Sequence, residues 1–479
     1  MNQGYFRQVT TRTPTRLWVN NPTAEELKRA LEAGAINCTT NPTYAARMLR
    51  QPETREESLH IVDEAVAETP DDTEAAALIQ RRLVAGMASG FMPHFKNTNG
   101  CEGFVSVQMD PRLEKDFARI VAKALADFEL IPNCIAKIPV IPSGLIAMDC
   151  LVRLNKPVVA TEIMGISQAI AACETYQKAS KESGHTPAFF VTHISGIFDE
   201  QLKADAEALG ITLSPESMRL AGCAIAKKQY AIMQDRGLPG ILLGGGARNL
   251  HHFTEMVGGK VHITLNWQST ISVLEENSPA VENLMDKSVP ETIIHELRDK
   301  LPTFARAYAE DGLKPEEFED FSPVVRFRTQ FLNGWYKLLE TIRERRAILQ
   351  ATTSKIDQNP KNDIPAMLTH RSFCRVGENS SVEMRPGIFR STLVYNTDNM
   401  LCHFFEKAGA RVDLHTHVAL QCGYVLSGKV KFFDATGNER ILGPGDGYLF
   451  NSNEPHGSVA LEETELIECF TPARPEYLD

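Results

Sequence analysis

The chain has 479 residues, of which 43% are hydrophobic and 23% charged, a composition typical of a folded globular protein. This length exceeds one ordinary hydrophobic core and predicts two or three domains. The net charge of −11 argues against a nucleic-acid or membrane-surface role, and no apolar run suits a transmembrane helix. Singly spaced cysteines and an N-terminus without an apolar leader predict a cytoplasmic protein with reduced thiols.

Short apolar segments alternate with helical patterns over the first 270 residues. The segments predicted as strands are residues 17–20, 35–41, 104–109, 134–140, 157–163, 188–194, 240–245 and 261–266. The intervening helical patterns, such as 24–33 and 215–234, follow the N-cap residues Thr23 and Ser214. Eight alternating strand–helix units predict a (β/α)₈ TIM barrel. We expect the helix-rich residues 285–350 to pack on the outside or bottom of this barrel.

Lys137 lies inside the apolar fourth strand segment, Cys134-Ile-Ala-Lys-Ile-Pro. A buried ammonium group is costly, and desolvation lowers its pKa, which produces an amine that attacks a ketone and forms a Schiff base. The alternative is a lysine at a sheet edge whose side chain extends to solvent.

Polar residues gather at the ends of the other predicted strands. If Lys137 points inward, side-chain alternation brings several of them around it. They are Asn20, Thr39, Asn41, Gln108, Thr161, His193 and Arg248. Because the carboxyl ends of barrel strands form the active site, this convergence predicts catalysis there. The same alternation predicts that Glu162 points away from the barrel axis, and we expect His251 and His252 at the surface or the substrate rim.

Four motifs in residues 15–270 resemble those of the transaldolase family, in the family's order. They are Cys38-Thr-Thr-Asn-Pro-Thr, Val105-Ser-Val-Gln-Met-Asp-Pro-Arg, Ala136-Lys-Ile-Pro and Ala247-Arg-Asn. The resemblance implies a class I aldolase barrel without a cofactor. Such a barrel transfers or releases a dihydroxyacetone-like unit of a ketose or ketose phosphate.

The resemblance also implies roles for individual residues. Lys137 would be the Schiff-base nucleophile, and Thr161 would hold a water that relays protons. Thr39 and Asn41 would bind substrate hydroxyls. Arg248 would bind a phosphate or another anion.

The chain departs from the family pattern at several positions. Asn20 replaces the usual catalytic aspartate, and Gln108 replaces a glutamate of many members, as it also does in the fructose-6-phosphate aldolase branch. An amide cannot take up a proton at neutral pH, so His193 is the candidate base, with a hydrogen-bonded structural histidine as the alternative. Gly196 stands where a second phosphate-binding arginine is expected, which predicts weaker phosphate binding.

A change of composition divides the chain. Residues 351–367 are polar and predict a linker between a barrel unit, 1–350, and a second domain, 368–479. Short alternating strands with Gly, Asn and Asp turns predict that this domain is a small all-β barrel or sandwich.

Three histidines and a glutamine in the second domain have the spacing of a metal site. They are His415, His417, Gln421 and His456. Imidazoles with an oxygen ligand suit a divalent transition metal such as Zn, Ni, Mn or Fe. The runs Gly443-Pro-Gly-Asp-Gly-Tyr and Glu454-Pro-His-Gly resemble the cupin pattern, and the glutamine resembles cupins that act on uronic-acid sugars. A metal-free sugar-binding cupin is the alternative.

These features together predict a two-domain carbohydrate enzyme. The barrel would perform Schiff-base aldol chemistry on a ketose, and the cupin would isomerise or ring-open a related sugar. Two alternatives remain: a cupin that only senses a sugar or forms dimers, and a barrel that is a non-catalytic sugar-binding scaffold. We expect small-molecule sugar substrates and a homo-oligomer.

Overall fold

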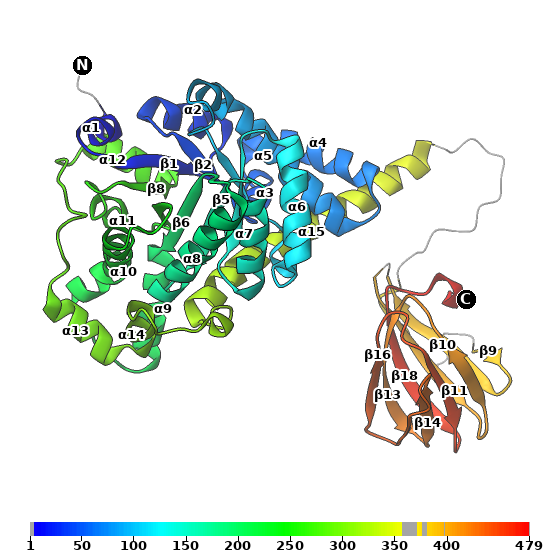
Figure 1. Cartoon of the computed structure of the whole chain (residues 1–479). Helices are drawn as coiled ribbons and strands as arrows, with labels where there is room; N and C mark the ends of the chain where they lie inside the picture. Colours follow the sequence, from blue (N-terminus) through cyan, green and yellow to red (C-terminus); the bar gives the residue numbers. More distant parts are fainter. Residues whose placement is uncertain (1–3, 357–370, 376–380, 397, 479) are drawn as a thin grey trace. The chain divides into compact units, whose positions relative to one another are not determined.

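The computed structural model describes residues 4–356, 371–375, 381–396 and 398–478 (Figure 1). It divides into two compact units, Met1–Gln358 and Asn359–Asp479. The helix α15 (Ser322–Ile356) continues into the stretch predicted as a linker, and the remainder of that stretch, 357–367, lies outside the described residues. Among the helices of the described part, none is long and apolar enough to cross a membrane.

Eight parallel strands close into a barrel in chain order, which confirms the predicted (β/α)₈ architecture (Figure 1). Every predicted strand segment overlaps one of them. The strands are β1 (Arg16–Asn20), β2 (Asn37–Thr39), β3 (Val105–Val107), β4 (Cys134–Pro139), β5 (Val158–Ile163), β6 (Phe189–Ile194), β7 (Ile241–Gly245) and β8 (Val261–Leu265).

Helices surround these strands, and their ends follow local sequence signals. Thr23 caps the second helix by accepting from the Glu26 amide while the Glu26 side chain accepts from the Thr23 amide, and Gly34 ends it in the left-handed region at φ 102°. The helices are α1 (Tyr5–Arg12), α2 (Ala24–Ala33), α3 (Tyr44–Met48), α4 (Pro52–Glu68), α5 (Asp72–Asn97), α6 (Phe117–Leu130), α7 (Pro142–Arg153), α8 (Ile166–Ser183), α9 (Ser195–Ala208), α10 (Pro215–Asp235), α11 (His251–Thr254), α12 (Ser272–Asn277), α13 (Glu291–Lys300), α14 (Pro302–Tyr308) and α15.

A small aromatic cluster fills the interior of the barrel. The rings of Trp18 and Phe190 meet edge to face at 4.8 Å, and the Trp18 indole donates to His262 Nδ1 at 2.9 Å. Burying such rings stabilises the fold by about 2–3 kcal/mol each. This packing decides which residues of each strand point inward, because alternate side chains of a strand face opposite sides.

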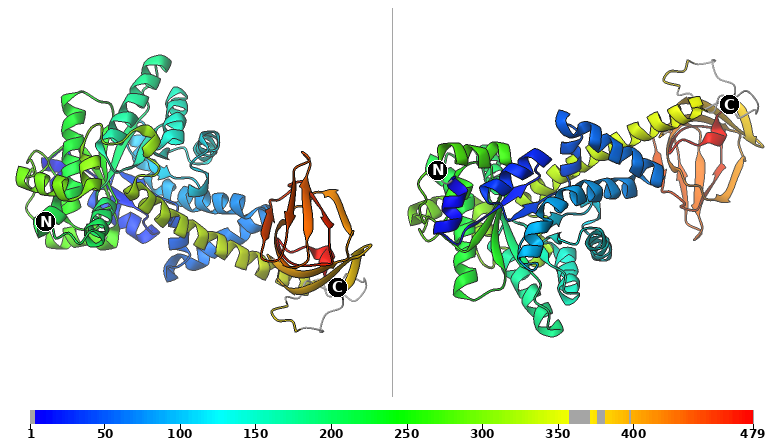
Figure 2. Two further views of the ribbon diagram at one scale, coloured as in Figure 1. Left: turned by 90° about the horizontal axis from the view of Figure 1, so that it is seen from below. Right: turned by 90° about the horizontal axis from the view of Figure 1, so that it is seen from above.

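The C-terminal unit consists of two antiparallel sheets that face each other (Figure 2). One has the order β16-β13-β18-β11-β10-β9 and the other β12-β17-β14-β15. The strands are β9 (Val382–Arg385), β10 (Ile388–Tyr395), β11 (Met400–Glu406), β12 (Arg411–His415), β13 (Leu420–Ser427), β14 (Val430–Asp434), β15 (Glu439–Leu442), β16 (Gly447–Phe450), β17 (His456–Ala460) and β18 (Thr464–Thr471). A hydrophobic core of its own, which includes Phe404, Val425 and Leu466, holds them together.

Candidate active site and candidate metal site

A cavity of about 410 Å³ lies at the carboxyl ends of the barrel strands. Five of the predicted site residues line it: Asn20, Thr39, Asn41, Lys137 and Arg248. Residues that the sequence analysis did not single out also line it, namely Thr192, Thr264, Asn266, Phe327, Gln330 and Phe331. The last three belong to α15, so this helix contributes to the cavity wall and does not merely cover the outside or bottom of the barrel.

Lys137 is 6% exposed and lies in a strand segment whose other residues are apolar. Burial lowers the pKa of its amine to about 8, and the negative charge of Glu162 opposes that shift. The ring of Phe331 lies 5.8 Å from Nζ. A substantial fraction of the amine is therefore unprotonated near neutral pH, as a nucleophilic lysine requires.

Amides and hydroxyls form a network in the cavity wall. The Asn20 side-chain amide donates to Asn266 Oδ1 at 2.8 Å, and the Thr39 hydroxyl donates to Asn20 Oδ1 at 2.8 Å. Thr264 Oγ1 lies 2.6 Å from the Thr39 hydroxyl. Among the described residues that line the cavity, none carries a carboxyl group. The wall therefore suits a ligand rich in hydroxyl groups, and a base for proton abstraction does not come from it.

Glu162 lies inside the barrel, contrary to the expected direction. Strand β5 carries an extra residue opposite β6 between Ala160 and Ile163, and Glu162 adopts φ 62° there. This bulge reverses the side-chain alternation. Glu162 is fully buried, and its Oε1 accepts from Gln108 Nε2 at 3.0 Å.

Gln108 and Thr161 lie beside the cavity without lining it. Gln108 is 2% exposed and Thr161 is fully buried. Within the described part of the chain, neither Thr161 Oγ1 nor Gln108 Oε1 has a hydrogen-bond partner. Both polar atoms therefore retain the capacity to bind a water or a substrate group.

The prediction that His193 points into the cavity is wrong. Its Nε2 lies 3.1 Å from the Gly222 carbonyl oxygen of α10, in the helix layer, and burial lowers its pKa to about 4. The cause is the register of β6, since Phe190 packs against Trp18 inside the barrel. Thr192 therefore occupies the inward position, and His193 is a buried structural histidine.

The segment after β7 carries Arg248 to the cavity rim. Arg248 Nε donates to Glu200 Oε1 at 2.7 Å, which partly neutralises its charge. His252 holds this segment in place, because its Nδ1 accepts from the Arg248 amide at 3.0 Å and its Nε2 donates to Asp199 Oδ2 at 2.7 Å. His252 is 1% exposed, so the expectation of a surface position is wrong for it.

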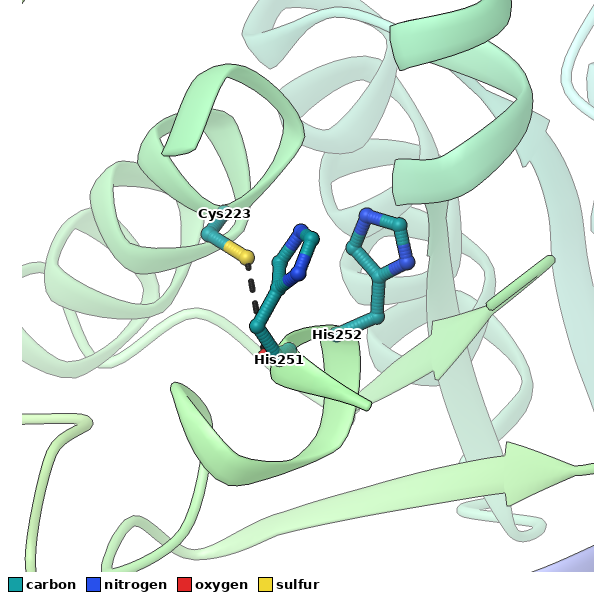
Figure 3. Close-up of side chains that lie close together, drawn as sticks. All are labelled: Cys223, His251 and His252. Atoms are coloured by element: carbon teal, nitrogen blue, oxygen red, sulfur yellow. Dashed lines mark hydrogen bonds between the residues drawn. The ribbon is translucent and has the colours of Figure 1, made fainter. Parts of the chain in front are cut away.

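Cys223 and His251 lie beside His252 (Figure 3). The Cys223 thiol donates to the His251 carbonyl oxygen at 3.9 Å. Both ring nitrogens of His252 are already engaged with protein groups, which leaves that imidazole no lone pair for a metal. We therefore interpret this cluster as a brace for the loop of Arg248.

Gly196 sits at the first turn of α9, against the same loop. A Cβ atom there would lie 2.4 Å from the Gly246 carbonyl oxygen and 2.9 Å from the Arg248 amide nitrogen. No side chain fits without backbone movement, so an arginine at this position is excluded sterically. The position of Gly196 thus supplies no arginine. A second arginine, Arg47 of α3, does line the cavity, and its guanidinium pairs with Glu26 at 2.8 Å.

Three histidines converge in the C-terminal unit. His415, His417 and His456 offer ring nitrogens within 4.8 Å of one another. Each Nδ1 lies 2.7–3.0 Å from a backbone carbonyl oxygen and donates to it, which directs the Nε2 lone pairs inward. Gln421 Oε1 lies 2.9 Å from His417 Nε2. This contact is favourable when Nε2 carries a proton or when both atoms bind one cation. Three imidazoles and an amide oxygen are also ligands that suit a divalent transition metal, so the residues fit a metal ion.

A cavity of about 410 Å³ adjoins the histidines and contains two buried carboxyl groups. Glu468 Oε1 accepts from the Gln421 side-chain amide at 2.6 Å and from the Tyr448 hydroxyl at 2.5 Å. Burial raises the pKa of Glu468 to about 7 and that of Glu406 to about 8. The cavity therefore combines a candidate metal site with groups that exchange protons near neutral pH.

These features define two classes of domain, a (β/α)₈ barrel with a polar cavity at its strand ends and a small antiparallel β-barrel with converging histidines. The chain belongs to the transaldolase/fructose-6-phosphate aldolase family, whose model matches residues 17–319. A cupin domain model matches residues 404–468. Both predicted family resemblances are confirmed, and the first supports an aldolase or transferase enzyme.

Relatives of known name match each part. A transaldolase of Thermobifida fusca is 26% identical over 274 residues, which cover 55% of this chain and 73% of that protein. A transaldolase of Mycobacterium tuberculosis is 23% identical, over 54% of this chain and 71% of its own. The structure of an RmlC-like cupin of Shewanella frigidimarina is 24% identical and covers 23% of this chain and all of its own, with a TM-score of 0.22. The structure of KdgF of Halomonas sp. is 32% identical and covers 22% of this chain and 99% of its own, also with a TM-score of 0.22.

Part of what the sequence analysis missed had a signal. Thr264 and Asn266 lie two apart at the end of the eighth strand, which alternation alone places on one face. Strand β6 had no such signal, because Phe189 and Phe190 are both large aromatics and only Phe190 packs against Trp18 inside the barrel. Glu162 had no such signal, because a bulge is set by packing around the strand.

Proposed function

We propose that the barrel is a Schiff-base aldolase or transaldolase that acts on a ketose or ketose phosphate. The observation that carries this proposal is a lysine with a lowered pKa in a cavity walled by hydroxyls and amides. The unprotonated amine of Lys137 attacks the ketone carbon and forms an iminium with loss of water. The bond between the carbon next to the iminium and the hydroxyl-bearing carbon beyond it then breaks. Its electron pair forms an enamine, the hydroxyl proton passes to a water beside Lys137, and an aldehyde leaves.

The proposed roles of the other residues follow from their positions. Asn20, Thr39 and Asn41 bind substrate hydroxyls in the wall, and Arg248 binds the far end of the substrate. Thr161 and Gln108 hold a water beside Lys137 through their unshared buried polar atoms. His193 has no part in this scheme, because its ring faces α10.

Both arginines that line the cavity are already paired with glutamates, which favours a substrate with little anionic charge at its far end. Arg248 pairs with Glu200, and Arg47 pairs with Glu26. Gly196 supplies no further cation. A phosphate dianion would have to displace the carboxylate. An unphosphorylated ketose or one with a single negative charge fits this rim better.

We further propose that the cupin binds a divalent transition metal and isomerises or ring-opens a related sugar. His415, His417, His456 and Gln421 would hold the ion, which supplies Lewis-acid polarisation of a sugar oxygen. Glu468 exchanges the proton, and Tyr448 and Gln421 orient its carboxyl group. Aldol chemistry needs an open-chain ketone, so a domain that opens rings complements the barrel. The alternative is a cupin that senses a sugar or forms dimers.

Borohydride trapping tests the barrel proposal. The protein is incubated with a panel of ketoses, reduced, and mapped by peptide mass spectrometry. We expect an adduct on Lys137 that is absent from K137M and retained in K228M. Lys228 is the matched control, because burial also lowers its pKa although it lies outside the cavity. A folded protein without an adduct from any ketose would contradict the proposal.

Metal analysis tests the cupin proposal. We expect about one transition metal per chain by elemental analysis, and loss of that metal in H415A/H456A. A sugar-opening assay monitored by NMR should fail in the same variant. A metal-free wild-type protein that still opens the sugar would contradict the proposal, and a metal-loaded protein inactive on all related sugars would favour the sensing alternative.

A further inference from the structure

We propose that Glu162 is the counter-ion of the protonated Schiff base at Lys137. Strand β5 supplies this carboxylate because the residue that follows strand β3 is the neutral Gln108. The inference rests on the proposed function of the barrel. An iminium at Lys137 carries a permanent positive charge. The described residues that line the cavity offer no carboxylate to balance that charge. A buried charge without a partner is costly.

The bulge in β5 brings a carboxyl group to this place. Lys137 of β4 lies opposite Val159 of β5, and Glu162 comes three residues after Val159. Its backbone adopts φ 62°, which turns the side chain inward. Its hydrogen bond to Gln108 joins β3 to β5 and so spans β4, the strand of Lys137. The carboxyl group is thus held close to the lysine strand from one side.

Gln168 of α8 stabilises the unusual backbone. Its side-chain amide donates to the Glu162 carbonyl oxygen at 3.2 Å and to the Val140 carbonyl oxygen at 3.0 Å, while its Oε1 accepts from the Met164 amide at 2.9 Å. A left-handed non-glycine residue costs about 1–2 kcal/mol. A strained residue that is fully buried, ionisable and braced in this way indicates a functional demand.

Two cations, Lys137 and Arg328, act on the charge of Glu162, and among the described residues Lys137 is the one that forms no ion pair with another carboxylate. Glu114 and Arg328 also face it, but they pair with each other at 2.9 Å. Glu162 Oε2 has no hydrogen-bond partner in the part of the chain that the structure describes. Burial and the charge of Glu114 raise the pKa of Glu162, and the charge of Lys137 lowers it. Each group of the pair therefore controls the protonation of the other.

The Glu162 carboxyl group can supply the proton that Schiff-base formation consumes. In the overall reaction, the neutral Lys137 amine condenses with a ketone, and the Glu162 carboxylic acid gives up its proton. The products are an iminium, a carboxylate and water. The carbon–oxygen bond breaks, a carbon–nitrogen double bond forms, and the acid supplies the proton that leaves with the oxygen. The two new charges arise together in a buried site, where their attraction is strong.

The test compares the isosteric variant E162Q with the exchange variant Q108E/E162Q in the borohydride assay. We expect E162Q to reduce the trapped fraction at pH 7 about tenfold. A tenfold change is the effect of a shift of one unit in a pKa. The exchange variant keeps the total charge and the hydrogen-bonded pair, and should recover to within about threefold of wild type. E406Q is the matched control, since Glu406 is equally buried with a raised pKa but lies in the cupin unit.

The pH profile separates a charge effect from a structural one. Because the negative charge of Glu162 raises the pKa of Lys137, E162Q should move the midpoint of trapping to lower pH by about half a unit or more. An E162Q profile equal to wild type would overturn the counter-ion role while leaving the proposed function intact. A wild-type protein that traps no ketose would overturn both. If E162Q does not fold, the exchange variant decides: recovered trapping supports the role, and a folded exchange variant without trapping overturns it.

Discussion

At the scale of single residues, burial and neighbouring charges set the protonation of Lys137 and Glu162 in the barrel site. Lys137 has its pKa lowered by desolvation, and Glu162 has its pKa raised for the same reason. Both groups are stabilised in their neutral forms relative to water, and each favours the charged form of the other. In the proposed chemistry, Lys137 is therefore the nucleophilic amine and Glu162 the proton donor.

The buried lysine should reduce the stability of the fold. Its pKa falls from 10.5 to about 8, so the K137M variant should be more stable at pH 7 by about 3 kcal/mol. Between pH 8 and 10.5 the unfolded state binds the extra proton, so wild-type stability rises with pH there. The advantage of K137M is therefore full below pH 8 and disappears toward pH 10.5. Urea unfolding across this range measures it, and an advantage independent of pH would contradict the explanation.

At the scale of elements, two segments outside the strands complete the barrel site. Helix α15 supplies Phe327, Gln330 and Phe331 to the cavity wall. The loop after β7 is held by His252 and by the close approach of α9 at Gly196. Strand ends therefore provide the polar groups, whereas a helix and a braced loop provide the enclosure and the cation.

The aromatic contribution of α15 should be measurable through Lys137. F331A removes the ring 5.8 Å from Nζ and admits water to the amine. Hydration favours the ammonium form, so the pKa of Lys137 should rise from about 8 toward its usual value. The midpoint of borohydride trapping should move to higher pH, with Y336F, a conservative change at an exposed residue of the same helix, as control. An unchanged midpoint would show that the ring does not control hydration of the amine.

The close contact at Gly196 should tolerate no side chain. G196A places a Cβ against two backbone groups of the loop, which should cost about 1–3 kcal/mol and weaken substrate binding through Arg248. G86A is the matched control: an exposed glycine of α5 with open space around it, where alanine should stabilise the helix by up to about 1 kcal/mol. Thermal unfolding and substrate titration measure both effects. Equal stability changes in the two variants would contradict the steric argument.

At the scale of the whole molecule, the chain combines two units with separate cores. The barrel cluster includes Leu17, Val105 and Ile263, and the cupin cluster includes Ile388, Val425 and Phe470. Separate cores unfold with separate free energies. Each proposed site also lies within one unit. The described residues that line the barrel cavity all belong to the barrel unit, and those that line the cupin cavity all belong to the cupin unit.

The two sites should therefore fail independently. K137M should abolish trapping without changing the metal content, and H415A/H456A should lose the metal without changing trapping. Added metal should raise only one of two thermal transitions in calorimetry, because binding stabilises the unit that holds the ion. A single variant that removes both activities in a folded protein would show that the sites are coupled.

The fold was predictable because its signals are local and repeated. Eight apolar segments, the capping residues of the helices between them, and the alternation along the C-terminal strands each reflect a short stretch of chain. The lysine, its polar neighbours and the histidines were visible for the same reason. The direction of His193 was not, since the β6 register depends on how Phe190 packs against Trp18 from another strand.

The amino-acid sequence by itself determined the barrel, the small β-barrel, the lysine at the centre of one and the histidines in the other, because periodicity and residue type carry that information. Only the tertiary structure decided that Glu162 faces inward and that α15 helps to enclose the cavity. A bulge and a distant helix obtain their positions from packing between segments far apart in the chain. No local pattern encodes such packing, and here it supplies the charge that the proposed chemistry needs.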